Sequence, residues 1–364
     1  MNTILILILL LVHINSQDYT VAEVYKNDKK GNKAVEALLQ AEGIKRDKNL
    51  DYTCACYDED YNIIATGSCF GNTLRCIAVS SKHQGEGLVN KMFSHLMQYQ
   101  FERNNFHLFL YTKCSSADFF GDLGFYEIVR IKDQIVFMEN KRTGFQDYLK
   151  QLSKTKKDAK KIAAVVMNAN PFTLGHQYLA EKASKENDIV HLFIVSEDKS
   201  VFPFNVRKRL IMEGTSHLKN IIYHDSGPYI ISSATFPSYF QKDENMVIES
   251  HANLDLEIFV KIAQSLDIKT RYVGEEPKSV VTGIYNEIMK TKLPQHGINC
   301  IIVPRKKENS GDIISASDVR LLIKEEKFDR LKKLVPESTY NYIMSPEAKP
   351  VIKKIKQTSD VKHY

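Results

Sequence analysis

A histidine that directly follows a glycine, at the start of an expected helix, is the first candidate for chemistry in this sequence. Residues 162–167 read IAAVVM, a continuous apolar run typical of a strand buried on both faces of a parallel sheet. Turn formers interrupt the run at 168–171, and helical spacing of apolar residues begins after His176. The free N–H groups at a helix start favour an anion in such a loop. We therefore expect this loop to bind phosphate.

The residues of the loop distinguish between kinds of phosphate chemistry. Neither the Gly-x-x-x-x-Gly-Lys-Ser/Thr pattern of a P-loop nor the Gly-x-Gly-x-x-Gly pattern of a dinucleotide fold occurs here. The tetrapeptide at 173–176, TLGH, resembles the Thr/His-x-Gly-His motif of the nucleotidyltransferase superfamily, whose members direct attack on the α-phosphate of ATP. The resemblance implies that His176 donates to the phosphoryl oxygens, that Gly175 permits close approach, and that Thr173 acts as a neutral donor. The alternative is an ordinary capping or solvated histidine.

A second motif lies near the far end of the chain. Residues 314–320 read ISASDVR and precede a helical pattern. They resemble the superfamily's Ile-Ser-Ser-Thr-x-x-Arg motif, in which Ser315, Ser317 and Arg320 would hold the β- and γ-phosphates at a helix start. Either serine alone could be an ordinary helix cap. The two motifs in this order indicate a nucleotidyltransferase.

Three further stretches are similar to the citrate lyase ligase family: 167–173, 229–240 and 273–277. The similarity covers nearly all of the chain after its first few tens of residues. It implies that acetate and ATP form acetyl-AMP and pyrophosphate. The acetyl group then passes to the phosphoribosyl-dephospho-CoA thiol on the acyl carrier subunit of citrate lyase. It also implies Mg²⁺, which arrives with ATP and is ligated mainly by the phosphates.

The same resemblance extends the set of expected site residues. Arg207, at an expected helix start, is a candidate contact for triphosphate or a partner, with a surface salt bridge as the alternative. Glu275 and Glu276 are candidate contacts for Mg²⁺ or ribose, although loop carboxylates are usually solvated. No protein ligand for the metal is assigned. The remaining residues expected around ATP are Asn168, Asn170, Pro171, Phe172 and Gly274.

A glycine loop in the first half of the chain points to a second kind of ligand. The stretch 76–88 ends in Gln84, Gly85, Glu86, Gly87 and Leu88, and it resembles the pyrophosphate loop of GNAT acetyltransferases. Residues 118–127 resemble the closing helix and strand of that fold. The loop departs from the pattern at 89, where valine replaces a small residue. Since no general base is evident, we expect this loop to bind the CoA-like prosthetic arm rather than to catalyse.

Two other functions stay open at this point. One is an adenylyltransferase that joins AMP to a phosphorylated small molecule, although its usual first loop with glycine and aspartate is absent. The other is an acetyl-CoA-dependent N-acetyltransferase whose second domain only regulates.

The elements that must position these residues predict two α/β domains. In an N-terminal GNAT-like α+β domain at 18–147 we expect a helix at 33–42 and strands at 61–70, 73–79 and 106–112. A basic linker is expected at 148–161, and a polar tail at 346–364. Residues 162–345 are expected to form a doubly wound parallel sheet of the Rossmann-like nucleotidyltransferase type. Its expected elements cover 162–168, 177–187, 189–196, 206–213, 220–225, 246–249, 254–265, 270–273 and 298–304.

The composition fits two folded domains and an anionic ligand. The 364 residues are 43% hydrophobic and 26% charged, which is typical of a globular chain with room for two cores. The net charge of +6 suits an anionic ligand or an acidic partner but is too small to indicate nucleic acid. The basic run at 150–161 has no interleaved aromatic residues, so we expect no nucleic-acid binding.

The N-terminus and the cysteines bear on the compartment. Residues 1–17 contain an apolar run at 4–12, shorter than the about 20 residues that a transmembrane helix needs, so no span is expected. Its length suits a signal peptide, but no Lys or Arg precedes it. The alternatives are a packed apolar segment or a misassigned start codon. The six cysteines contain no C-x-x-C pair, and most of them are expected to be reduced core residues. Together with the family resemblance they favour the cytoplasm.

Overall fold

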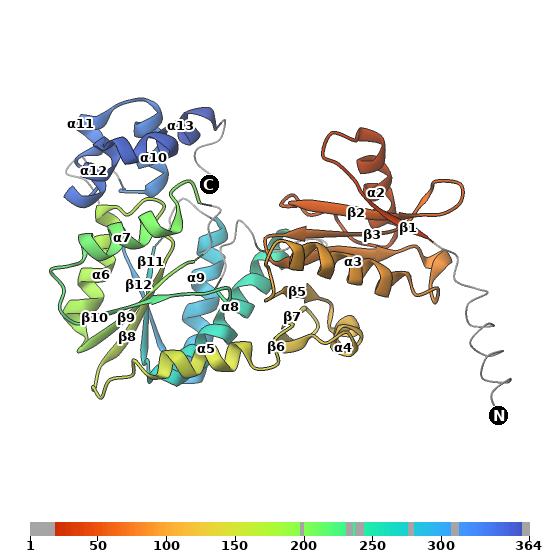
Figure 1. Cartoon of the computed structure of the whole chain (residues 1–364). Helices are drawn as coiled ribbons and strands as arrows, with labels where there is room; N and C mark the ends of the chain where they lie inside the picture. Colours follow the sequence, from red (N-terminus) through yellow and green to blue (C-terminus); the bar gives the residue numbers. More distant parts are fainter. Residues whose placement is uncertain are drawn as a thin grey trace. The chain divides into compact units, whose positions relative to one another are not determined.

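The computed structural model describes residues 19–196, 200–230, 236, 244–275, 280–306 and 313–358 (Figure 1). The chain divides into two compact units. The first contains the described residues up to Glu127 together with Ile135–Arg142. The second contains Ile128–Gln134 and the described residues from Thr143 onward. Residues 1–18, which include the apolar N-terminal run, lie outside the described residues.

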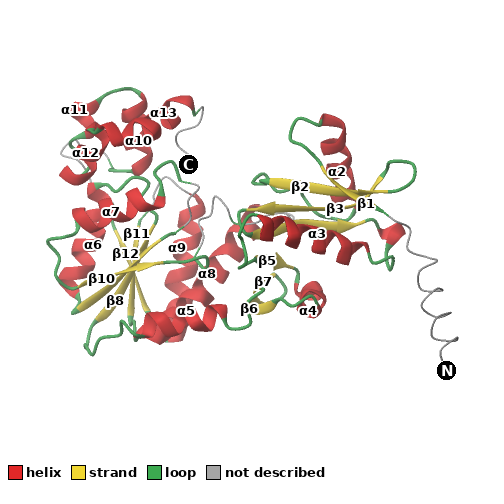
Figure 2. Cartoon of the chain, viewed as in Figure 1, coloured by secondary structure: helices red, strands yellow, loops and turns green. Residues whose placement is uncertain are grey.

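The strands before Asn140 form a mixed seven-stranded sheet, in the order β1-β2-β3-β4-β5-β7-β6, most of which belongs to the first unit (Figure 2). Strands β1 to β4 pair antiparallel, as do β5 and β7. The neighbours β4 and β5 are parallel and pair only at Thr73–Phe109 and Leu74–Leu110. The strands are β1 Thr20–Glu23, β2 Tyr52–Tyr57, β3 Ile63–Phe70, β4 Thr73–Val79, β5 Phe109–Thr112, β6 Tyr126–Ile131 and β7 Ile135–Glu139.

Two helices cover opposite faces of this sheet because its residues alternate. Cys54 and Cys56 belong to a buried cluster with Leu88 of α3 (Leu88–Glu102). Ala55, between them, belongs to a second cluster with Val35 of α2 (Lys29–Ala41). A strand that sends successive side chains to opposite faces packs a helix on each. A short helix, α4 (Ala117–Asp122), precedes β6. The expected α+β fold of this half is confirmed.

The second unit is built on a five-stranded parallel sheet, in the order β10-β9-β8-β11-β12. The chain runs outward from β8 to β9 and β10, then crosses to β11 and β12 on the other side of β8. The order reverses between β8 and β11, which is where such sheets bind ligands. The strands are β8 Ile162–Met167, β9 Ile189–Ile194, β10 Ile221–Asp225, β11 Thr270–Gly274 and β12 Asn299–Val303. The expected doubly wound sheet is confirmed.

Helices cover both faces of this sheet, and Figure 1 shows α6 and α7 on one side with α8 and α9 on the other. One buried cluster joins the strands to α6 (Leu174–Glu186), α7 (Phe204–Gly214), α10 (Ala316–Lys324), α11 (Phe328–Leu331), α12 (Glu337–Met344) and α13 (Lys349–Gln357). On the other face α8 (Glu244–Leu266) packs against α9 (Val280–Lys292) and α5 (Gly144–Ser153). Right-handed crossovers require this division once the strand order reverses.

Several boundaries differ from the expectation. Residues 246–249 form the first part of α8, because 244–266 contain neither Gly nor Pro to interrupt the helix. Helix α9 was not expected. The start of the expected linker lies in α5, whose Phe145 and Leu152 are buried. The expected polar tail is helical up to Gln357, since Val351 and Ile355 fall on one apolar face.

Two further findings concern membranes and cysteines. Within the described part of the chain, no helix combines the length and the apolar character needed to cross a membrane. All six cysteines are free thiols, and Cys54, Cys56, Cys69 and Cys76 are buried as expected.

Candidate functional site

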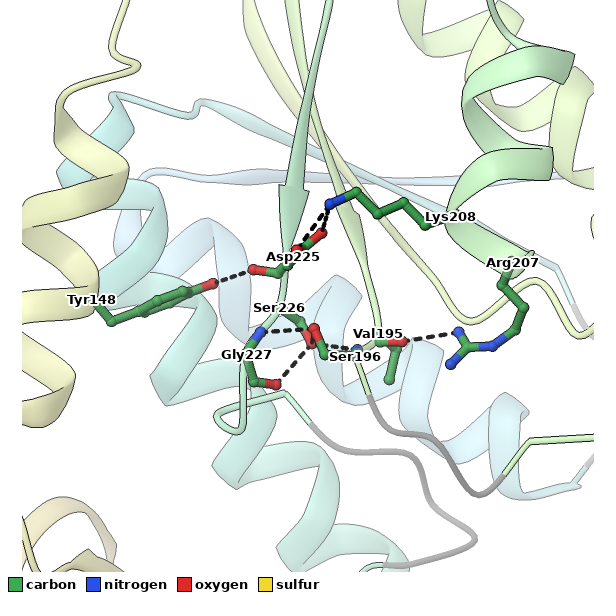
Figure 3. A network of polar contacts seen from close by, with 8 residues as sticks. All are labelled: Tyr148, Val195, Ser196, Arg207, Lys208, Asp225, Ser226 and Gly227. Atoms are coloured by element: carbon green, nitrogen blue, oxygen red, sulfur yellow. Dashed lines mark hydrogen bonds and ion pairs between the residues drawn. The ribbon is translucent and has the colours of Figure 1, made fainter. Parts of the chain in front are cut away.

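The loop after β8 is held by a buried arginine. Arg207 of α7 is fully buried, and its Nη1 donates to the carbonyls of Asn168 and Val195, each at 2.9 Å. Its Nε donates to the carbonyl of Phe202 at 3.0 Å. Figure 3 shows this guanidinium directed at the end of β9. The expected phosphate contact or surface salt bridge is therefore not what the structure shows: Arg207 fixes the loop from beneath.

Hydrogen bonds from Thr173 determine the state of His176. Thr173 caps α6, and its backbone N–H donates to His176 Nδ1 at 3.1 Å. The Thr173 hydroxyl lies 2.9 Å from the same nitrogen. Because Nδ1 accepts, the proton of a neutral ring is on Nε2. Removal of the ring from water, with a smaller effect of Arg305, lowers the pKa of His176 to about 3. The ring is thus a neutral donor at physiological pH.

The second motif forms the start of α10 and is tied to the first loop. Ser315 caps the helix, with its Oγ accepting from the N–H of Asp318 at 3.1 Å. Arg320 donates from Nη1 to the carbonyl of Asn170 at 2.5 Å and from Nη2 to Ser317 Oγ at 3.1 Å. Burial lowers the pKa of Arg320 to about 10, so the side chain stays charged at neutral pH.

The two motifs line one cavity of about 460 Å³ at the carboxyl ends of β8 and β11. It lies at the reversal of strand order, where the first loop, β11 and the starts of α6 and α10 meet. The expected residues that line it are Asn168, Asn170, Gly175, His176, Gly274, Ser315, Ser317 and Arg320. Residues separated by most of the domain are thus brought together.

Other expected residues lie elsewhere. Phe172 is fully buried in the core, where a Cβ on Gly214 would lie 2.4 Å from its ring. Thr173 is also fully buried and acts on His176 rather than on the cavity. Glu275 is exposed, and it contributes its backbone to the site through a bond to Arg305. Pro171, within the loop, is buried, and Glu276 lies outside the described residues.

Two cations at the end of β12 were missed by the sequence analysis. Arg305 and Lys306 both line the cavity. Arg305 donates from Nε to the carbonyl of Glu275 at 2.6 Å and from Nη1 to that of Ile314 at 3.4 Å. Burial lowers the pKa of Arg305. The sequence could have indicated these two residues, because residues 304–306 read Pro-Arg-Lys directly after an apolar strand. Ligands bind at the carboxyl ends of such strands.

The charges around the cavity suit a polyphosphate. The described residues that line it include the cations Arg305, Lys306 and Arg320 and the buried ion pair of Arg271 with Asp255. The starts of two helices add their N–H groups. Among the described residues, no group of three or more His, Cys, Asp or Glu side chains could hold a metal ion.

The ends of β9 and β10 are joined beside this site (Figure 3). Ser226 Oγ accepts from the N–H of Ser196 at 2.9 Å, and Ser196 Oγ accepts from the N–H of Gly227 at 3.0 Å. Lys208 pairs with Asp225, and Tyr148 of α5 donates to the carbonyl of the same aspartate. These hydrogen bonds hold the carboxyl ends of β9 and β10, and the loops that follow them, in fixed positions.

The glycine loop of the first unit is exposed. Gly85 and Gly87 have φ of +87° and +73°, and Gly87 is the N-cap of α3. Leu88 is buried at the helix start, whereas Gln84 is exposed. Glu86 accepts from the Tyr19 hydroxyl at 2.6 Å. Val89 does not prevent the helix from beginning at Leu88.

A parallel sheet whose carboxyl edge carries a His-bearing and a Ser/Arg-bearing helix start defines a nucleotidyltransferase-like domain. The family described as the citrate lyase ligase C-terminal domain matches residues 162–343. A [citrate [pro-3S]-lyase] ligase of Haemophilus influenzae is 38% identical over 315 residues, covering 85% of this chain and 94% of the relative. The [citrate [pro-3S]-lyase] ligase of Klebsiella pneumoniae is 35% identical over 322 residues, which cover 87% of this chain and 94% of that relative. The chain belongs to the citrate lyase ligase family of ligases.

Proposed function

We propose that the chain activates acetate with ATP and transfers the acetyl group to a thiol of citrate lyase. In the first half-reaction a carboxylate oxygen of acetate attacks the α-phosphorus of ATP. The bond to the β-phosphate breaks, and acetyl-AMP and pyrophosphate form. In the second, a thiolate attacks the acetyl carbon and AMP leaves. The thiol belongs to the prosthetic group on the acyl carrier subunit of citrate lyase.

The observation that carries this proposal is the neutral, oriented ring of His176 in a cavity rich in cations. Its Nε2–H is the group left to meet the α-phosphate, since Nδ1 accepts from Thr173. A donor held in place before reaction stabilises the charge that develops on the phosphoryl oxygens. Arg305, Lys306 and Arg320 stabilise the departing pyrophosphate, together with the N–H groups at the start of α10.

The residues present fit ATP with Mg²⁺ held by its phosphates. When bound, Mg²⁺ would neutralise part of the phosphate charge. The chain's own part is to bind and orient the triphosphate, with Ser317 beside Arg320. Ser315 acts through the helix start, because its hydroxyl donates to Asp318 Oδ2 at 2.7 Å and caps α10. We propose no protein ligand for the ion.

For the second half-reaction we propose that Gln84, Gly85, Gly87 and Leu88 bind the CoA-like arm. The free N–H groups at the start of α3 suit its phosphates. We also propose that the protein acts in the cytoplasm, because its reaction needs ATP.

Exchange of labelled pyrophosphate into ATP tests the proposal directly. The purified full chain with Mg²⁺ should catalyse this exchange only when acetate is present, since acetyl-AMP formation is reversible. Exchange that requires a phosphorylated small molecule instead would indicate an adenylyltransferase. Acetyl transfer from acetyl-CoA without ATP would indicate an N-acetyltransferase.

A further inference from the structure

The cavity extends beyond the two motifs to a second group of residues. We call it the acid chamber and define it by Ile248, His251 and Asp255 of α8, Arg271 of β11, and Tyr285 and Asn286 of α9. Spacings of three and four place the α8 residues on one helix face. None of them belongs to either motif or to the neighbouring cations that serve the triphosphate.

A buried cation is the centre of the acid chamber. Arg271 is 3% exposed, and its Nη2 donates to Asp255 Oδ2 at 3.0 Å and lies 3.3 Å from the Tyr285 hydroxyl. The Tyr285 hydroxyl donates to the same carboxylate. The buried Nε of Arg271 has no hydrogen-bond partner among the described residues.

Stability does not explain this arrangement. A buried ion pair gains little over well-packed apolar residues, because both charges lose their hydration. A buried donor left without a partner has a further unfavourable free energy. Arg271 and Asp255 both line the cavity, which favours a role for this buried ion pair at a ligand site.

The acid chamber combines polar and apolar walls in a way that suits a small carboxylate. His251 and Asn286 are hydrogen-bonding groups that line the same cavity as Arg271, and Asn286 donates to the carbonyl of Gly274 at 3.2 Å. Ile248 supplies an apolar wall. A carboxylate needs donors at one end only, and a short alkyl group needs the apolar contact.

We propose that the acid chamber binds the carboxylic acid co-substrate, a short-chain monocarboxylate, and that Ile248 limits the length of its alkyl chain. This rests on the proposed function, since it assigns the acid's place in that reaction. His251 and Asn286 orient the carboxylate toward the α-phosphate at His176, beside the Arg271 guanidinium, whose charge Asp255 balances.

Replacement of the apolar wall tests the length limit. Pyrophosphate exchange is measured on the full chain with acetate, propionate and butyrate as probes. In Ile248→Ala the ratio of kcat/KM for butyrate to that for acetate should rise about tenfold or more, as for methylene discrimination in pockets generally. The KM for ATP should not change. Val247→Ala is the matched control, since Val247 is a partly buried neighbour on α8 that does not line the cavity.

A second variant tests the polar end and does not depend on the first. His251→Asn should raise the KM for acetate about tenfold, as expected for a lost hydrogen bond to a charged group, with the KM for ATP unchanged. Should Ile248→Ala fail to fold by circular dichroism, Ile248→Val with propionate replaces it.

The outcomes separate the assignment from the proposed function. One outcome overturns the assignment of the acid chamber but not the proposed function. In it the wild type catalyses exchange, the butyrate-to-acetate ratio of kcat/KM is unchanged in the Ile248 variant, and the KM for acetate is unchanged in His251→Asn. A raised KM for ATP with an unchanged acid ratio assigns these residues to the nucleotide and also overturns it. Wild-type exchange with none of the three acids overturns the proposed function itself.

Discussion

At the scale of single residues, His176 and Thr173 act as a pair. The ring donates from Nε2 because Thr173 occupies Nδ1 with its N–H and its hydroxyl. We expect His176→Ala to lower acetate-dependent pyrophosphate exchange about a hundredfold or more, the usual effect of losing one such donor. Thr173→Val should lower it less, since the backbone N–H still orients the ring. Near-full exchange by a folded His176→Ala protein would contradict the assignment.

The protonation of His176 gives a pH prediction. Its pKa, lowered to about 3, means that the ring is already neutral throughout the range from pH 5.5 to 8. The value of kcat/KM reports on ionisations of the free enzyme. We therefore expect that His176 causes no decrease in kcat/KM for ATP near pH 6.5, the ordinary pKa of histidine being about 6.5. The profile of His176→Asn should therefore have the same shape at a lower level. An inflection near pH 6.5 that the variant removes would show a proton-transferring histidine instead.

Arg305 offers a test of the charge at the cavity. We expect Arg305→Gln to lower exchange and raise the KM for ATP, because a partly desolvated cation beside phosphate interacts more strongly than one in water. Arg305→Lys should restore part of the activity. The matched control is Arg209→Gln, which removes an exposed arginine paired with Glu347. Equal effects of the two Gln variants would show that Arg305 acts only through the general charge of the chain.

At the scale of elements, the starts of α6 and α10 must approach closely. A Cβ on Gly175 would lie 3.3 Å from the carbonyl of Ile314, so α6 and the segment before α10 would have to move apart. We expect Gly175→Ala to lower exchange and leave the fold intact. Gly283, exposed on α9 with open space around it, is the matched site. Gly283→Ala should stabilise the protein by roughly 0.5–1 kcal/mol with unchanged exchange, as measured by thermal unfolding.

At the scale of the whole molecule, the proposed work is divided between two units. Gly85 and Gly87 have positive φ, so side chains there would strain the backbone as well as repel phosphate. Gln84→Glu adds only charge. We expect Gln84→Glu to raise the KM for the carrier thiol about fivefold and to leave exchange unchanged. The added carboxylate would weaken the interaction between the start of α3 and the phosphates of the arm by about 1 kcal/mol. Gln40→Glu, exposed on α2, is the control. Equal effects on both half-reactions would give the first unit a scaffold role.

The sequence by itself determined the alternation of strands and helices, the doubly wound parallel sheet and the two helix starts that carry the motifs. These depend on residues close together in the chain: the apolar run before Asn168, the Thr173 cap and the Ser315 cap. Local spacing and capping need no knowledge of the rest of the molecule. The errors concern the extent of helices: residues 246–249 and 254–265 belong to one helix, and the tail is helical up to Gln357. Their signals, the absence of Gly and Pro and the spacing of Val351 and Ile355, are also local and were overlooked.

Only the tertiary structure decided which groups meet. Arg207 has the spacing of a surface residue on a helix start, yet packing buries it under the loop. Arg320 bonds to Asn170 across 150 residues of sequence, and Arg305 comes beside His176 from another strand. The acid chamber likewise joins α8, β11 and α9. Such contacts depend on how helices are distributed over the sheet, which is a property of packing rather than of any single stretch.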